Sequence, residues 1–369
     1  MFVHAAANLV QLNGKPMPDF NTLIPKDPLV FQVAWESTLK CNLDCSYCGD
    51  GHDNKSSHPL LSNCLDTVDF IFKYLDIKMK QRPLHMQQSN LNVQGGESLF
   101  HPKIIDILRY INKKKADVDW HLGTATITNA VVGANLWKRL AQYLDYYTIS
   151  YHPESTTKQQ QLVKDNILFL KSINKTFHVS IMMHPKHWDN CVSMVDWCKE
   201  NNIECNARQI DHHWLDMRFN YNKEQTTYLT GKEITAKDKL MYALSKGLNL
   251  SSTGRACCGG NTLCAGGCET NYVQDNKFKG WHCSVADYFL YIRQTTGEVF
   301  TNKDCRMNYD GNVGPIGNLK DPKTIFSKMH NNGVVCKKSS CWCGLCAPKA
   351  ATKELFINAT KEDLNHSIE

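Results

Sequence analysis

The feature that most constrains the fold is an alternation of two kinds of segment across residues 30–212. Short strand-like runs alternate with longer stretches whose apolar residues recur at the spacing of a helix. Repeated βα units of this kind predict an α/β fold, in which helices cover a parallel sheet. The expected strands are 31–37, 89–94, 121–128, 145–151, 176–183 and 203–209.

Three cysteines follow the first expected strand in the pattern Cys-x3-Cys-x2-Cys, at Cys41, Cys45 and Cys48. A loop of this length can place three thiols around one face of an iron–sulfur cube. A [4Fe–4S] cluster needs four ligands, normally all cysteine, so the motif leaves one iron without a protein ligand. That iron is open to another molecule, as a catalytic metal keeps an open position. The alternatives are a disulfide framework and half of a zinc site, with Cys343 and Cys346 as the second pair.

A second motif, Gly95-Gly96-Glu97, follows the second expected strand. Two glycines allow a backbone to approach a ligand closely, and a carboxylate suits an ammonium group. In a parallel sheet, ligands bind at the carboxyl ends of the strands. We therefore expect the Gly-Gly-Glu turn and the cysteine loop to open on the same rim of the sheet.

These two motifs, with Tyr47 as the aromatic residue before the third cysteine, resemble those of the radical SAM (S-adenosylmethionine) enzymes. The resemblance implies a partial (β/α)6 TIM-like barrel, which the six expected strands would form. It also implies that the open iron binds the amino and carboxylate groups of SAM and that the reduced cluster cleaves SAM. A 5′-deoxyadenosyl radical would then take a hydrogen atom from the substrate. Ser98 stands where the family usually has proline, which removes no ligand.

The resemblance also assigns residues to a SAM site. In the family, a small hydroxyl at a strand end lies near the ribose, and a basic or amide side chain lies near the carboxylate or adenine. Other polar residues at strand ends, such as Thr128, Asn129 and His152, are explained more simply by structure. The residues implied to bind SAM are Tyr47, Gly95, Gly96, Glu97, Ser150 and Arg208.

Ten further cysteines lie from Cys257 to Cys346, and this density indicates metal ligation. Among them, residues 283–300 show strand alternation with a hairpin turn at Thr296-Gly297. This order resembles the SPASM or twitch extension of many radical SAM enzymes, in which cysteines around a hairpin hold an auxiliary iron–sulfur cluster. The corresponding positions here are Cys283, Cys305, Cys343 and Cys346.

The ligand set of this second region stays open, because its spacing departs from the SPASM pattern. Cys336 or Cys341 could replace one of the expected ligands. Four more thiols lie within twelve residues on a glycine-rich loop and could bind a second auxiliary cluster, bind zinc, or contribute to the first cluster. These are Cys257, Cys258, Cys264 and Cys268.

Composition bears on the compartment and the partners. The chain has 17 cysteines and no recognisable signal peptide, which predicts a reducing cytoplasm and metal ligation rather than disulfides. It contains no run of 18 apolar residues, so no membrane span is expected. The net charge of +6 would tolerate an anionic substrate but does not by itself indicate nucleic acid.

The expected organisation is a core followed by a small cysteine-rich α+β extension. Many peptide maturases of the family carry a leader-peptide domain before the core, and the N-terminal arm is too short for one. The expected segments are the arm (1–29), the radical SAM core (30–212), a connector (213–250), the SPASM-like or twitch-like extension (251–350) and a tail (351–369).

The expected substrate is a peptide, an amino acid or a small molecule, with the reaction subclass open. A nucleotide or nucleic acid is the alternative substrate. A non-catalytic iron–sulfur or zinc protein is the alternative of another class. The resemblance also implies an electron donor of the flavodoxin or ferredoxin type.

Overall fold

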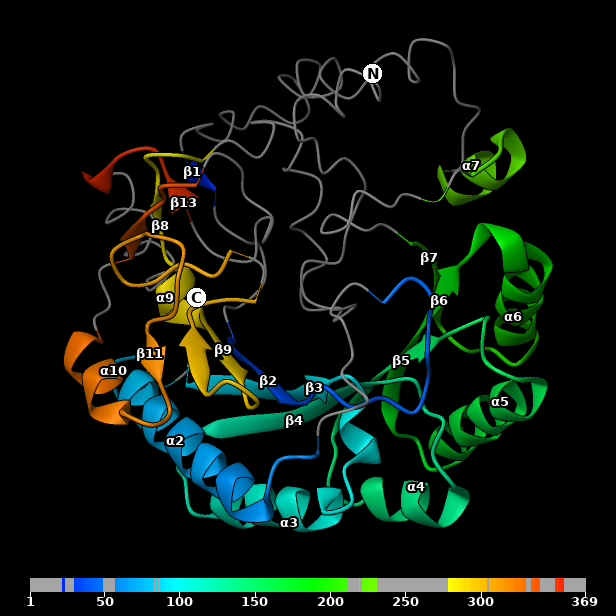
Figure 1. The fold of residues 1–369 in the computed structure, drawn as a ribbon, viewed down its shortest axis with the longest axis horizontal. Coiled ribbons are helices and arrows are strands. Elements are labelled where there is room, and N and C mark those ends of the chain that lie inside the picture. The colour runs from blue at the N-terminus through cyan, green and yellow to red at the C-terminus, as the bar shows by residue number, and fades with distance from the viewer. Residues whose placement is uncertain are drawn as a thin grey trace.

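The computed structural model describes residues 22–23, 30–48, 57–82, 84, 87–210, 219, 221–230, 278–303, 305–329, 333–338 and 349–354. Most of the expected arm, connector and tail lies outside these residues. The main feature is a large, mostly parallel sheet whose strands alternate with helices, which confirms the predicted α/β fold (Figure 1). The sheet is curved, and the helices between its strands cover the convex side.

Six parallel strands form the body of the sheet in chain order, and they correspond to the six expected strands. The largest difference is in the sixth, which begins at Cys205 rather than at residue 203. The strands are β2 (Phe31–Thr38), β3 (Gln88–Gly95), β4 (His121–Thr128), β5 (Tyr146–Tyr151), β6 (Thr176–Met183) and β7 (Cys205–Gln209).

A helix follows each of the first five of these strands, because the intervening sequence repeats apolar residues at helical spacing. The helix after β5 begins with a capping box, in which Thr156 and Gln159 each bond the other's backbone. The five helices are α2 (Leu61–Lys80), α3 (Ile104–Ala116), α4 (Ala134–Leu140), α5 (Thr157–Ser172) and α6 (Trp188–Glu200). Shorter helical segments are η3 (Ser98–Phe100), η4 (Pro185–His187) and α7 (Lys223–Thr230).

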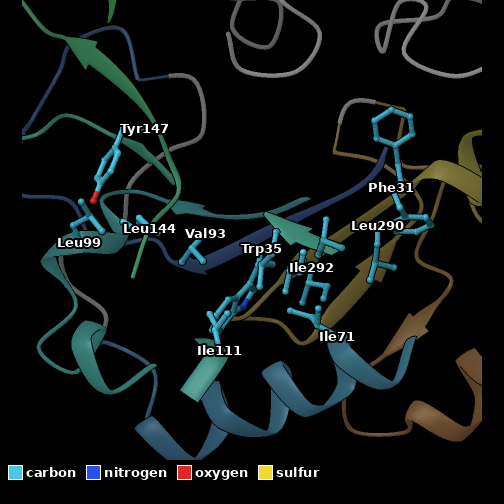
Figure 2. Packing of buried hydrophobic residues seen from close by; sticks show 14 of the residues in the cluster. Phe31, Trp35, Ile71, Val93, Leu99, Ile111, Leu144, Tyr147, Leu290 and Ile292 are labelled. Carbon is cyan, nitrogen blue, oxygen red and sulfur yellow. The ribbon is translucent and has the colours of Figure 1, made fainter. Parts of the chain in front are cut away.

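The apolar side chains of the strands face these helices. Along β2, Phe31, Val33 and Trp35 occupy alternate positions and are fully buried. Figure 2 shows Trp35 on the same side of the sheet as Ile71 of α2 and Ile111 of α3. This interface is the hydrophobic core, and it fixes the register of the strands because a one-residue slip would expose it.

The opposite, concave face of the sheet is polar. The interior of a closed α/β barrel is normally packed with bulky branched side chains. Here the alternate positions, which point away from the helices, carry mainly amides, hydroxyls and charged groups. This face is therefore not a second hydrophobic core. Its polar residues are Gln32, Glu36, Asn90, Asn92, Gln94, Thr148, Ser150, His178, Ser180, Asn206 and Arg208.

The sheet continues beyond β2 with strands from the C-terminal part of the chain, a pairing that the sequence does not predict. Strand β9 (Phe289–Arg293) pairs parallel to β2 and forms a hairpin with β10 (Glu298–Phe300). The hairpin turn lies at the predicted Thr296-Gly297, where Gly297 has a φ of +71° that suits glycine. With β11 (Gly317–Asn318) at the edge, the order within the described residues is β11-β10-β9-β2-β3-β4-β5-β6-β7.

A second sheet joins short strands from both ends of the chain, in the order β1-β13-β8-β12. None of the described helices is both long enough and apolar enough to cross a membrane. The strands are β1 (Thr22–Leu23), β8 (His282–Cys283), β12 (Val334–Val335) and β13 (Lys349–Ala350). Two short helices of the same part of the chain pack on the large sheet, α9 (Val285–Tyr288) against β2 and β9 and α10 (Pro322–Lys328) against β11.

Buried polar contacts hold the C-terminal hairpin to β2. The Glu36 carboxylate is 3% exposed, accepts a hydrogen bond from the Tyr291 hydroxyl at 2.6 Å, and pairs with the Arg293 guanidinium at 3.3 Å. The Trp35 indole N–H donates to the side-chain oxygen of Gln294 at 2.9 Å. A buried carboxylate is tolerated when a cation and a hydroxyl satisfy it, so side chains reinforce the β2–β9 ladder.

A buried ion pair links α2 to the C-terminal segment as well. Lys78 Nζ, on a side chain that is 1% exposed, lies 3.4 Å from Asp287 Oδ1 of α9. Burial lowers the pKa of the Lys78 ammonium, and the Asp287 carboxylate opposes this shift. Asp287 keeps 14% of its side chain exposed and also accepts the Gly333 N–H at 3.1 Å. The lysine therefore depends on the aspartate more than the aspartate depends on the lysine.

We expect Asp287→Ala to destabilise the protein more than Lys78→Met. Loss of the carboxylate removes the acidic partner of a buried ammonium, and breaking a buried ion pair in this way costs about 3–5 kcal/mol. Loss of the ammonium leaves a carboxylate that keeps solvent and the Gly333 N–H, while methionine fills the vacated space. Urea denaturation followed by circular dichroism measures both free energies of unfolding. Equal losses in the two variants would contradict this ordering.

Candidate functional site

Two motifs that lie far apart in the sequence meet at the carboxyl end of the sheet. The chain leaves β2 at Thr38 and enters the cysteine loop beside the turn Gly95–Glu97. The Gly96 N–H donates to the Thr38 carbonyl at 2.8 Å, and the Glu97 N–H donates to the Lys40 carbonyl at 2.7 Å. The structure thus places the cysteine loop and the Gly-Gly-Glu turn on one rim, as the sequence predicts.

Both glycines are required by the close approach of these two backbones. A Cβ atom at Gly95 would lie 2.1 Å from the Thr38 carbonyl oxygen. At Gly96 it would lie 2.4 Å from the Lys40 carbonyl oxygen and 2.5 Å from that of Leu39. No side chain fits at such distances, so only glycine permits the approach. The sequence predicts that these glycines allow a ligand to approach the backbone. In the structure, the protein's own backbone occupies one side of them.

The Glu97 carboxylate is engaged by the protein itself. It is 1% exposed and accepts the backbone N–H groups of Leu99 at 3.0 Å and Asn129 at 2.7 Å, and the Thr128 hydroxyl at 3.0 Å. Burial raises the pKa of Glu97 to about 7, and these donors oppose the rise. The side chain therefore joins the turn after β3 to the end of β4. Its contact with the SAM ammonium stays a prediction.

The thiols of Cys41, Cys45 and Cys48 are half-buried and lie close together. Burial raises the pKa of Cys41 to about 11 and that of Cys45 to about 12, and neighbouring thiols of the loop add to both shifts. Within the described residues, no three Cys, His, Asp or Glu side chains converge on the position of a single metal ion. A cube binds each thiolate through a different iron, so its ligands need not converge in that way.

The donor set fits an iron–sulfur cluster on chemical grounds. Metal ligation requires the thiolate form of cysteine, and a bound metal supplies positive charge that stabilises it. Two N–H donors, one from the backbone and one from a side-chain amide, lie near the Cys41 sulfur. The Leu43 N–H donates to Cys41 Sγ at 3.4 Å, and Asn129 Nδ2 lies 3.7 Å from the same atom. Such donors favour the charged form of a thiol.

The loop after β5 holds the middle of the cysteine loop. The Glu154 carboxylate accepts both the backbone N–H of Ser46 at 2.7 Å and its hydroxyl at 2.6 Å. His184 Nε2 lies 3.6 Å from the same carboxylate. Ser46 stands between Cys45 and Tyr47, so this double hydrogen bond fixes the part of the loop that carries the second thiol.

Tyr47 packs behind the cysteine loop and is 5% exposed. Its ring stacks on His152 with centroids 5.9 Å apart and planes 17° apart, and its hydroxyl lies 2.9 Å from His152 Nδ1. The hydroxyl also hydrogen-bonds the Cys45 thiol, whose sulfur is 3.5 Å from His152 Nδ1. Burial lowers the pKa of His152 to about 4, so its ring is neutral at pH 7. Tyr47, which the sequence predicts to contact SAM, thus contacts a cysteine of the loop.

Ser150 and Arg208 lie on the polar concave face. The ladder pairs Ser150 with Ser180, and Ser180 with Asn206. Arg208 is two residues further along β7, nearer its carboxyl end, and pairs with Met182. Both predicted SAM contacts therefore face the hollow side of the sheet, at the end where the cysteine loop lies.

Several buried polar atoms on this face have no hydrogen-bond partner within the described part of the chain. They are Oδ1 of Asn92, Oγ of Ser180 and Oδ1 of Asn206. Buried polar groups nearly always form hydrogen bonds, so atoms of this kind indicate bound water or a bound molecule. The concave face is equipped to hold a ligand through hydrogen bonds.

Three residues of the site were not predicted to belong to it: Asn129 and His152, which the sequence favours as structural strand-end residues, and Glu154, which no motif marks. Each follows closely on the end of β4 or β5, which is the signal that could have marked them. Their contacts with the cysteine loop could not be predicted, because those contacts depend on how loops from different strands pack together.

Three of the C-terminal cysteines are described, and all are buried: Cys283 and Cys305 are 2% exposed and Cys336 is 5% exposed. Cys283 pairs with Val334 in the β8–β12 ladder, and the Cys336 N–H donates to the Trp281 carbonyl at 2.8 Å. This register puts Cys336 on the same face as Cys283, as a diagonal neighbour. The other candidate ligands lie outside the described residues: Cys257, Cys258, Cys264, Cys268, Cys341, Cys343 and Cys346.

No family model matches the sequence, and no curated protein matches it. Solved structures do resemble the fold. The structure of anSMEcpe with bound AdoMet has a TM-score of 0.50 at 11% identity, over 91% of this chain and 96% of that one. Streptococcus suis SuiB bound to S-adenosylmethionine has a TM-score of 0.47 at 12% identity, over 78% of this chain. SuiB bound to precursor peptide SuiA has a TM-score of 0.41 at 13% identity, over 74% of this chain and 60% of that one.

The present chain covers 64% of the SuiB chain solved with S-adenosylmethionine, which is less than two thirds of it. At these identities the likeness concerns the arrangement of strands and helices. The likeness to anSMEcpe, which has the TM-score of 0.50, agrees with the curved α/β sheet described above.

We expect Gly96→Ala to displace the start of the cysteine loop and to destabilise the protein by about 1–3 kcal/mol, as overpacking does. The added Cβ would meet two backbone carbonyl oxygens, neither of which can move without shifting β2 or the loop. Gly133→Ala is the matched control, because a Cβ there meets no atom within 4 Å. Thermal and urea unfolding measure the difference, and equal stabilities of the two variants would contradict the close approach.

Proposed function

We propose that this chain is a radical SAM enzyme whose cofactor site is the rim where the cysteine loop meets the Gly-Gly-Glu turn. The observation that carries the proposal is the hydrogen bonding of residues 38–40 to Gly96 and Glu97, which brings the two motifs together. When bound, a [4Fe–4S] cluster and S-adenosylmethionine would supply reductive cleavage of the cofactor to a 5′-deoxyadenosyl radical, which abstracts a hydrogen atom from the substrate.

The chain's own residues would bind and orient these groups. Cys41, Cys45 and Cys48 would be the three protein ligands of the cube. The Tyr47 hydroxyl and the Asn129 amide would donate hydrogen bonds to ligand sulfurs, a contact that tunes cluster potential.

The SAM contacts are proposed at the same rim. Gly95 and Gly96 would present backbone atoms to the cofactor on the side not filled by residues 38–40. Glu97, held by Thr128 and two backbone N–H groups, would keep that turn in place and could face the ammonium of SAM. Ser150 and Arg208 would contact the rest of the cofactor from the concave face.

The substrate would lie on the polar concave face beyond SAM. The buried Asn92 Oδ1 and Ser180 Oγ lack partners within the described residues and suit a ligand that donates hydrogen bonds. A peptide, an amino acid or a polar small molecule has such donors. The negative charge of Glu36 on this face is compensated, because its carboxylate forms an ion pair with the Arg293 guanidinium.

We further propose an auxiliary iron–sulfur cluster in the C-terminal region. Cys283 and Cys305 are proposed ligands and are both buried, and Cys336, the possible replacement, shares one face of the small sheet with Cys283. Cys343 and Cys346 are the other proposed ligands. Electrons for the catalytic cluster must come from outside the chain, and a flavodoxin or ferredoxin is the proposed source.

Replacement of Cys41, Cys45 or Cys48 by alanine is expected to abolish 5′-deoxyadenosine formation from SAM, because each thiol would bind a different iron of the cube. Anaerobic assays with dithionite and product detection by liquid chromatography measure this. Cys64→Ala, at a buried helix position of α2, is the control and should retain the activity. Full activity in any of the three loop variants would refute the assignment. A wild-type protein that leaves SAM intact would favour the non-catalytic metal protein.

Iron analysis tests the auxiliary cluster separately. Two cubes require about eight irons per chain and one cube requires about four. We expect the anaerobically reconstituted protein to contain more than four, and the Cys283→Ala/Cys336→Ala variant to fall toward four. A wild-type content of about four irons per chain would contradict the auxiliary cluster and would leave the proposal of the catalytic cluster unaffected.

A further inference from the structure

A groove lies outside the concave face, between α3 and α4, on the helix side of the sheet. These helices run beside one another in Figure 1. The groove has a volume of about 370 Å³, and its walls are mainly apolar, with Phe100, Ile105, Val132 and Leu136 among them. None of the polar residues of the concave face is among the residues that line this groove, so the proposed substrate site does not account for it.

A single side chain, that of Asn42, connects the groove to the part of the cysteine loop that carries Cys41. Asn42, next to Cys41 in the sequence, lines the groove. Asn42 Nδ2 donates to the carbonyl of Val131, another lining residue, at 2.7 Å. Asn129 Nδ2 donates to Asn42 Oδ1 at 2.7 Å and lies 3.7 Å from Cys41 Sγ. A continuous series of hydrogen bonds therefore leads from the groove wall to a ligand of the proposed cluster.

The rim of the groove combines one exposed aromatic side chain with positive charge. Phe100 is 48% exposed and is the one exposed large hydrophobic residue of the lining. Arg139 lines the groove, and Lys103 stands in the sequence between two lining residues, Pro102 and Ile104. Both cations are exposed, and neither has an ion-pair partner among the described residues. The one carboxylate of the lining, Asp106, is already paired with Arg109 at 2.9 Å. The groove is thus mainly apolar, with unpaired positive charge at Arg139 and at the adjoining Lys103.

We propose that this groove is the docking surface for the protein that reduces the cluster, and that this protein is an acidic electron carrier. The inference rests on the proposed function. An apolar side chain of the carrier would enter the groove, and its carboxylates would face Lys103 and Arg139. Small interfaces with charged rims are typical of weak, rapidly exchanging electron-transfer complexes. One electron would pass from the reduced prosthetic group of the carrier to the oxidised cluster, with no bond formed or broken.

The test compares two variants of equal net charge. Lys103→Glu/Arg139→Glu reverses the two unpaired cations at the groove. Lys323→Glu/Lys328→Glu reverses two exposed lysines of α10, which packs against β11 at one edge of the sheet and does not line the groove. The dissociation constant of each protein for an acidic flavodoxin is measured by calorimetry at low and high salt. The rate of 5′-deoxyadenosine formation is measured with reduced flavodoxin and, separately, with dithionite.

We expect the groove variant to bind flavodoxin at least about tenfold more weakly at low salt and to lose most of the salt dependence, because rim charges control association. Its flavodoxin-driven rate should fall by a similar factor, while its dithionite-driven rate stays unchanged. The α10 variant should differ from wild type by less than threefold. Phe100→Ser should also weaken flavodoxin binding, through loss of the apolar contact, without altering the dithionite-driven rate.

Two outcomes would overturn the docking assignment. In one, the groove and α10 variants bind flavodoxin equally. In the other, the groove variant loses its dithionite-driven rate, which would mean that the groove serves the active site itself. Failure of the proposed function is distinguishable, because the wild type would then not cleave SAM with dithionite while flavodoxin binding could still be measured.

Discussion

The site depends on the close contact of two backbones. Residues 38–40 leave β2 and pass so near to Gly95 and Gly96 that a single methyl group on either glycine would overlap a carbonyl oxygen. Two hydrogen bonds, from Gly96 to Thr38 and from Glu97 to Lys40, extend the β2–β3 pairing to the first residue before Cys41. The position of the first thiol is therefore set by the sheet. The side-chain contacts of Asn129, Glu154 and Tyr47 then fix the remainder of the loop.

The two faces of the sheet divide stability from ligand binding. The helix side is apolar and closely packed, with Trp35 and Val33 fully buried. The concave side carries amides and hydroxyls, some of them without partners in the described residues. Burying such groups costs free energy unless a ligand or water forms hydrogen bonds with them. The concave side therefore does not form a second hydrophobic core. The convex core therefore holds the register of most strands that line the concave face, and the contacts of Glu36 add to it between β2 and β9.

The C-terminal segment supports the strand that carries the proposed catalytic cluster. Strand β9 extends the sheet on the free side of β2, and Glu36 of β2 is held by Tyr291 and Arg293 of β9. The Lys78–Asp287 ion pair adds a second link, through α2. The region of the second group of cysteines and the first cysteine loop are thus connected through β2. The groove between α3 and α4 meets the same loop from the other side, at Asn42.

The strands and helices of the core could be predicted from the sequence, because the apolar periodicity that identifies them is local. The spacing of Cys41, Cys45 and Cys48 and the Gly-Gly-Glu turn are local patterns too, and both follow predicted strands. The roles of individual side chains were less accessible. Glu97 is enclosed by Thr128 and Asn129, the Tyr47 hydroxyl faces Cys45, and β9 pairs with β2. These contacts join residues distant in the sequence, so only the packing of the whole sheet decides them.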